Sequence, residues 1–120
     1  MPERWDTKQW RAANETLRER SSSRCELCGV AFGASDKVVR HHRQRRAVGG
    51  DRLANLLMLH DACHVRIHSH PAESREAGWI VSTYIADPAS VPVAYQRGRQ
   101  VWLDDEGRAW EQFQPQPRGG

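Results

Sequence analysis

The stretch that decides the fold is residues 38–68, VVRHHRQRRAVGGDRLANLLMLHDACHVRIH. Its β-branched start predicts a strand over 37–42, and its apolar run LLML predicts a second strand over 56–59. Between them we expect a loop over 43–52 that turns at Gly49-Gly50-Asp51. A helix is predicted over 62–70, with Asp61 as its N-cap and Pro71 as its stop. Both predicted strands therefore end close to histidines.

The cysteines predict a structural metal site. Cys25 and Cys28 stand in C-x2-C spacing, and His60 and Cys63 repeat the same two-residue gap. Three thiolates and one imidazole make a tetrahedral zinc site, which contributes folding energy directly in a small chain. Two alternatives stay open at this point. His64 can replace His60 as the fourth ligand, or Cys63 is a buried apolar side chain and only the first pair binds metal.

The remaining histidines predict a second metal site. His64 and His68 are four residues apart, so both leave the same face of the predicted helix. His41 and His42 are neighbours on a strand and point to opposite faces, so that one of them can join the helical pair. Solvent-exposed histidines also occur at this spacing. Asn55 precedes the second strand, where its side chain can brace the loop through hydrogen bonds.

Taken together, these motifs resemble those of the HNH endonucleases, in particular the small phage and prophage type. The resemblance covers about residues 20–85, and it rests on Cys25-Glu-Leu-Cys28, His41-His42-Arg43, Gly49-Gly50-Asp51, Asn55-Leu-Leu, Cys63-His64 and Ile67-His68. His60 departs from the pattern, because relatives usually carry cysteine there. Histidine is a competent zinc ligand, so the departure does not remove the site.

The resemblance implies a role for each matching residue. His42 would be the general base, His41, His64 and His68 would hold the catalytic ion, and Asn55 would brace the loop. That ion would be Mg²⁺, Mn²⁺, Ni²⁺ or Zn²⁺, in addition to the structural zinc. The substrate would be DNA, with phosphates contacted by Arg40, Arg43, Arg45, Arg46 and Arg66.

The flanking segments complete an α+β prediction. We expect one domain over 1–113: a helix over 5–20, a ββα-metal core within about 21–85 and a β extension over about 86–113. Residues 79–85 are strand-like, and strands over 99–103 and 109–113 flank a hairpin turn at 104–107. The tail 114–120 is predicted to be disordered. Three tryptophans of the C-terminal half are expected either in ordinary packing or on a partner-binding surface: Trp79, Trp102 and Trp110.

Composition narrows the class of protein. The chain has 120 residues, of which 38% are hydrophobic, so its apolar core is small. Residues 37–70 carry seven basic and two acidic residues, a net +5, whereas the remainder, with eleven and thirteen, is −2. This basic segment indicates a polyanionic partner or a solvated basic face.

The cellular setting and the partners follow as expectations. With no secretory signal or membrane span recognised, we expect the cytoplasm of a bacterial host cell. The main alternative function is a non-catalytic zinc module that binds DNA or protein. By analogy with phage relatives, the large subunit of a terminase is a further expected partner.

Overall fold

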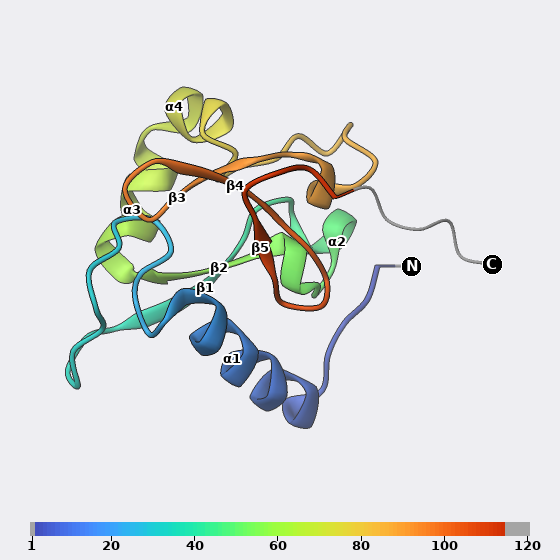
Figure 1. The fold of residues 1–120 in the computed structure, drawn as a ribbon. Coiled ribbons are helices and arrows are strands. Elements are labelled where there is room, and N and C mark those ends of the chain that lie inside the picture. The colour runs from blue at the N-terminus through green and yellow to red at the C-terminus, as the bar shows by residue number, and fades with distance from the viewer. Residues whose placement is uncertain (1, 115–120) are drawn as a thin grey trace.

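The computed structural model describes residues 2–114, so the predicted disordered tail lies, except for Gln114, outside the described residues. Helices and strands follow one another as α1 (Thr7–Ser21), β1 (Val38–His42), α2 (Arg46–Gly49), β2 (Leu56–His60), α3 (Asp61–Ser69), α4 (Pro71–Glu76), β3 (Val93–Tyr95), β4 (Arg99–Leu103) and β5 (Ala109–Trp110), with 3-10 turns at Leu53–Asn55 and Pro88–Ser90. The fold is therefore α+β, as predicted (Figure 1). Among the described helices, none has both the length and the apolar character needed to cross a membrane.

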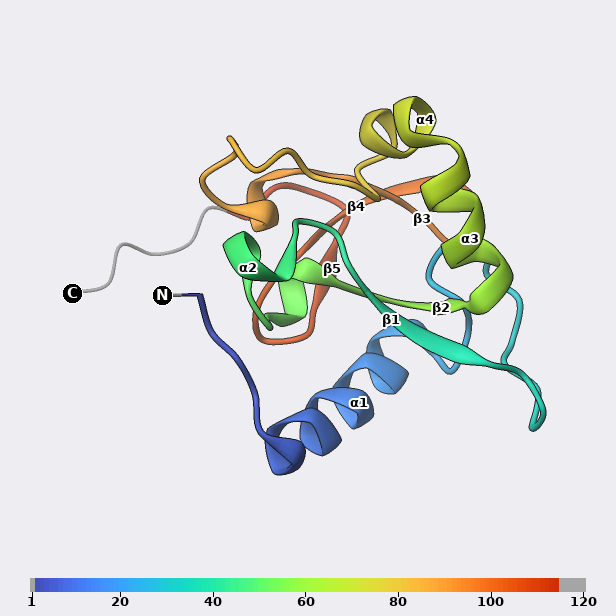
Figure 2. The same cartoon turned by 180° about the vertical axis from the view of Figure 1, so that it is seen from behind.

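The centre of the molecule is the antiparallel hairpin of β1 and β2, in which Val38 pairs with His60 and His42 with Leu56. Figure 2 shows α1 on one side of this hairpin and α3, with the second sheet, on the other. Leu56 and Met58 pack in a cluster with Leu17 of α1, whereas Leu57 and Leu59 belong to the larger core cluster around α3 and the second sheet. A strand buried on both faces is apolar at every position, which explains LLML.

The N-terminal helix starts at Thr7, two residues after the predicted start, with Asp6 as its N-cap. The Asp6 carboxylate accepts a hydrogen bond from the Gln9 N–H, and the Gln9 side chain accepts one from the Asp6 N–H. This capping box satisfies two N–H groups that the first turn leaves without partners. The helix ends at Ser21, one residue beyond the predicted end.

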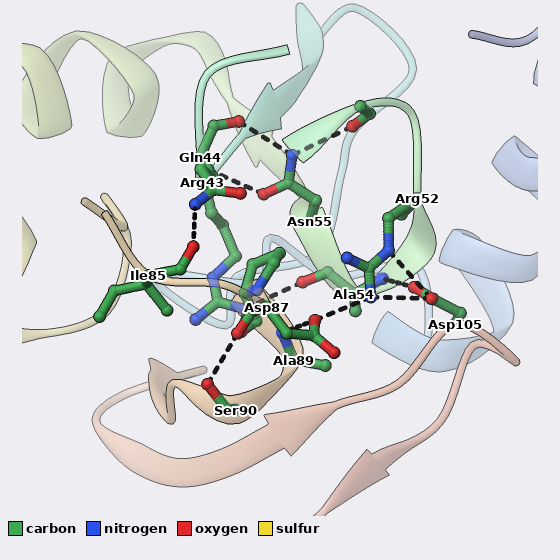
Figure 3. Close-up of polar contacts among 12 residues, drawn as sticks. Arg43, Gln44, Arg52, Ala54, Asn55, Ile85, Asp87, Ala89, Ser90 and Asp105 are labelled. Carbon is green, nitrogen blue, oxygen red and sulfur yellow. Dashed lines mark hydrogen bonds and ion pairs between the residues drawn. The ribbon is translucent and has the colours of Figure 1, made fainter. Parts of the chain in front are cut away.

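The C-terminal residues form the sheet β3-β4-β5, which is tied to the hairpin by polar contacts. Arg52 donates to Asp87 and to Asp105, and the Ala54 N–H also donates to Asp105 (Figure 3). The tryptophan indoles are used within the chain: Trp79 is buried and donates to the Ala94 carbonyl, and Trp110 donates to Asp104. For Trp79 the packing alternative therefore holds, whereas Trp110 is half-buried.

Several predicted elements were wrong. Residues 79–85 form no strand, because their N–H groups turn to other partners: Trp79 and Ile80 both donate to the Ser74 carbonyl, and Val81 donates to that of Arg43. Pro71 does not end the helical region but begins α4, since proline is tolerated in a first helical turn. The N-cap of α3 is His60 rather than Asp61. The sequence reasoning also missed α2, inside the predicted loop, and β3.

Arg43 is a structural residue, and the prediction that it contacts DNA was wrong. Its side chain is 1% exposed, and its guanidinium donates to four backbone carbonyls, those of Ala54, Gly78, Pro88 and Val91. Burial lowers its pKa to about 9, so the group still carries its charge at neutral pH. The side chain cross-links the segment after β1 to the chain before β3.

We expect Arg43→Met to lower the free energy of unfolding by about 3 kcal/mol or more, because buried carbonyls that lose a donor cost about 1–3 kcal/mol each. Urea unfolding followed by tryptophan fluorescence measures the change. Arg45→Met, two residues away on an exposed side chain, is the matched control and should stay within about 0.5 kcal/mol of the wild type. Equal stabilities for the two variants would contradict the structural role.

Candidate functional site

The predicted structural metal site is brought together by three parts of the chain. Cys25 and Cys28 lie in the turn after α1, His60 ends β2, and Cys63 lies in the first turn of α3; their ligand atoms all lie within 4.8 Å of one another. The Gly29 N–H donates to the Cys25 carbonyl, and the positive φ of 76° at Gly29 suits a glycine in this tight turn. This group can hold a metal ion such as zinc.

The donor chemistry of this group fits a cation. The three thiols are free, and burial together with the neighbouring Cys25 and Cys28 raises the pKa of Cys63 to about 12. Thiolates packed this closely are stable only beside a compensating positive charge, which a divalent ion provides. His60 is oriented for the same task, because its Nδ1 lies 3.5 Å from the Cys28 sulfur while its Nε2 lies 3.2 Å from Asp36. Of the two histidines considered as fourth ligand, His60 is the one that joins the cysteines.

A second group is formed by His41 of β1 and by His64 and His68 of α3, again with ligand atoms within 4.8 Å of one another. The Nε2 atoms of His64 and His68 lie 3.0 Å apart. His41 Nε2 lies 2.7 Å from the Trp79 carbonyl. Because a carbonyl only accepts, this Nε2 carries the proton and Nδ1 keeps the lone pair that a metal needs.

The electrostatics of this group favour neutral imidazoles, the form that binds metals. Burial lowers the pKa of His41 to about 4, although the hydrogen bond that His41 donates to the Trp79 carbonyl acts to raise this pKa. Burial, followed by the proximity of His68, also lowers the pKa of His64. Three imidazoles that leave further coordination positions open suit Zn²⁺, Ni²⁺ and similar divalent ions.

His42 points to the other face of β1 and is held by a carboxylate that sequence reasoning did not single out. Its Nε2 lies 2.8 Å from Oδ1 of Asp51, whose side chain is fully buried. Asp51 also accepts two hydrogen bonds from Arg46 and one from the Trp5 N–H. Burial would raise the pKa of Asp51, but these donors hold it down to about 2. The ionised carboxylate therefore accepts the Nε2 proton of His42 and leaves Nδ1 as the basic nitrogen.

Asn55 braces the loop between the strands in the way its position predicts. Its side-chain oxygen accepts from the Gln44 N–H, and its amide donates to the carbonyls of Gln44 and Gly50 (Figure 3). Gly49 is required for this contact, because a Cβ at that position would lie 2.6 Å from the Asn55 amide nitrogen. The loop carrying Asp51 is thus held against the start of β2.

A cleft of about 450 Å³ opens beside the histidines. It is lined by His41, His42, Arg43, Arg45, His68, Arg75, Ile80, Val81, Ser82 and Thr83. The segment 80–83 that forms one wall is held by Gln44, whose amide donates to the carbonyls of Ser82 and Ile85. The cleft gives a ligand access to the imidazoles from the solvent.

The arginines predicted to contact DNA are dispersed. Arg45 is exposed at the cleft, and Arg40 is exposed on β1, 5.9 Å from the ring centre of Trp10. Arg46 is occupied by Asp51. Arg66 pairs with Glu73 at 3.0 Å and lines a different hollow beside Cys28, since it lies half a turn or more around α3 from His64 and His68.

Sequence reasoning missed three residues of the site: Asp51 as the partner of His42, Asp36 as the partner of His60, and Arg75 at the cleft. Only Asp51 had a signal, because it stands in the Gly49-Gly50-Asp51 turn between the two strands. Comparisons with protein-family models, curated proteins and solved structures find no match for this chain.

Proposed function

We propose that this protein is a metal-dependent DNA endonuclease of the HNH kind, which hydrolyses phosphodiester bonds with His42 as general base. The observation that carries the proposal is that a three-histidine group and a His42–Asp51 pair both lie at the end of β1. The imidazoles of His41, His64 and His68 converge on one face of β1. His42, backed by the buried Asp51, leaves the other face of β1 but lines the same cleft as His41 and His68. A hydrolase that cuts phosphodiesters needs both a metal site and a base.

In this proposal His41, His64 and His68 hold the catalytic ion. When bound, a divalent ion supplies Lewis-acid stabilisation of the charge that develops on the phosphate and on the leaving 3′-oxygen. His42 Nδ1 takes the proton from the attacking water, because its Nε2 is engaged by Asp51 and Nδ1 keeps the free lone pair. Asp51 fixes the ring and stabilises the imidazolium that forms.

The cysteine group is proposed to hold the structural zinc. Cys25, Cys28 and Cys63 supply thiolates and His60 an imidazole, a closed set of four that leaves no position for a substrate. The zinc would therefore tie the turn after α1 to β2 and α3 without taking part in the reaction. This arrangement also explains why a chain with so small an apolar core can fold.

A plasmid-nicking assay tests the function. The protein is first dialysed to remove weakly bound ions while the tightly held zinc stays in place. Mg²⁺, Mn²⁺ or Ni²⁺ is then added. Supercoiled plasmid should be converted to nicked or linear forms only with added ion, and His64→Ala should lower the rate by about 10²-fold or more. A wild-type protein that binds DNA but cuts with none of these ions would contradict the proposal and favour the non-catalytic zinc module.

Asp51→Asn is expected to slow cleavage by about 10²-fold, because the amide cannot hold His42 in one orientation or stabilise its charged form. Single-turnover rates at saturating enzyme measure this effect separately from DNA affinity. Glu111→Gln removes the same charge from an exposed carboxylate that pairs with Arg99, and it should leave the rate unchanged. A rate for Asp51→Asn within twofold of the wild type would contradict the positioning role.

A further inference from the structure

We propose that Arg75 of α4 is a substrate-binding residue, and that it and Arg45 hold two phosphates of a DNA strand lying across the histidine group. The proposal rests on the proposed nuclease function and specifies where its substrate lies. Arg75 was not among the arginines expected to contact DNA. It lines the same cleft as Arg45, His41, His42 and His68.

The two guanidiniums are available for an anion. Both side chains are exposed, and among residues 2–114 no carboxylate lies within ion-pair distance of either one. Other arginines of the region are already occupied: Arg46 by Asp51, Arg52 by Asp87 and Asp105, and Arg43 by backbone carbonyls. Arginine without a partner, facing a cleft, suits the two oxygens of a phosphate.

The two residues come from separate elements, so a strand that meets both must cross the cleft. Arg45 directly precedes α2, and Arg75 lies in α4; Figures 1 and 2 show these two helices well apart. The buried Ser74 hydroxyl fixes α4 to the end of α3 by donating to the carbonyls of Ile67 and His70. Arg75 is thereby held on the helix that follows the one carrying His68, whereas Arg45 lies three residues after His42.

The contact is sequence-independent. Apart from the histidines and arginines, the cleft is lined by the aliphatic side chains of Ile80 and Val81 and by Ser82 and Thr83, and the arginine cations match the phosphate backbone. Each phosphate that is neutralised on duplex DNA contributes about −0.9 to the slope of log K against log salt, and about −0.7 on a single strand. The number of phosphates held by each arginine can therefore be counted.

The experiment measures binding of a fluorescein-labelled duplex by anisotropy across a salt series, with His42→Ala as the background so that the DNA stays intact. Adding Arg75→Gln should weaken binding about three- to tenfold at low salt and reduce the salt slope by about 0.9; Arg45→Gln and Arg75→Gln together should reduce it by about 1.8. Arg75→Lys should restore most of the slope, because it keeps the charge. A slope reduction near 0.7 would indicate a single strand at the cleft.

Arg97→Gln is the matched control, since Arg97 is an exposed arginine that lines the separate hollow beside Cys28. It should leave the slope unchanged. An unchanged slope for Arg75→Gln, or an equal loss for Arg97→Gln, would overturn the proposal even if the wild type cuts DNA. A wild type that binds DNA and shows the Arg75 effect, but never cuts, would instead overturn the nuclease function alone. A wild type that does not bind the duplex would overturn both.

Discussion

The His42→Ala variant is expected to lose metal-dependent cleavage by about 10²–10⁴-fold, which is the usual contribution of a positioned general base. The loss should fall on the chemical step, because His42 contacts Asp51 and the Trp10 ring and is not one of the three imidazoles that converge. Single-turnover nicking with saturating divalent ion measures the loss. Zinc content, thermal unfolding and DNA affinity should match those of the wild type.

His70→Ala is the control for that experiment. His70 belongs to neither of the two candidate metal-binding groups, is exposed, and lies at the junction of α3 and α4. Cleavage by this variant should equal that of the wild type. If His42→Ala keeps the wild-type rate, the base must be another group, and the Asp51–His42 pair would be structural only.

Cys25→Ser is expected to release about one zinc per chain and to unfold the protein. Binding of a structural zinc contributes about 10–16 kcal/mol, which is as large as or larger than the whole stability of about 5–15 kcal/mol typical of a domain. The buried position of Cys25 in the main core cluster adds to the cost. Metal analysis of the purified protein and circular dichroism during heating measure the two effects.

His60→Cys separates loss of the metal from loss of the side chain. Cysteine is also a zinc ligand, so this variant should keep about one zinc per chain and unfold cooperatively. Cys25→Ser protein that retains both its zinc and a cooperative transition would contradict the assignment of the four ligands. Zinc loss without unfolding would show that the apolar clusters suffice for the fold.

The sequence predicted those parts of the molecule in which residues of one chemical type recur at a spacing typical of a metal site, a helix or a strand. C-x2-C and its repeat in His60-x2-Cys63 can be recognised because two pairs of soft ligands, each at a two-residue gap, are typical of zinc sites. The pair His64 and His68 follows from the helical repeat, and the strand before His42 follows from its β-branched residues. These elements and both histidine-containing groups therefore appear in the structure near their predicted places.

What the sequence could not predict depends on long-range contacts. Arg43 and Arg45 look alike in a basic run, but only the first meets carbonyls from residues 54, 78, 88 and 91. Residues 79–85 have the composition of a strand, yet their N–H groups find partners outside any ladder. Arg75 could not be assigned to the cleft from the sequence, because its position depends on where α4 lies. The helix α4 itself was not predicted, because a proline can either end or begin a helix.

The geometry of α3 sets a strict limit on insertions and deletions. Cys63 and His64 are consecutive, yet one joins the cysteine group and the other joins the histidine group. Each residue turns an α-helix by about 100°, so one residue added or lost between 63 and 68 would rotate one set of ligands away from its partners. Exposed positions such as Val65 can change their side chain without this effect. The segment from 60 to 68 should therefore accept substitutions at such positions while its length stays constant.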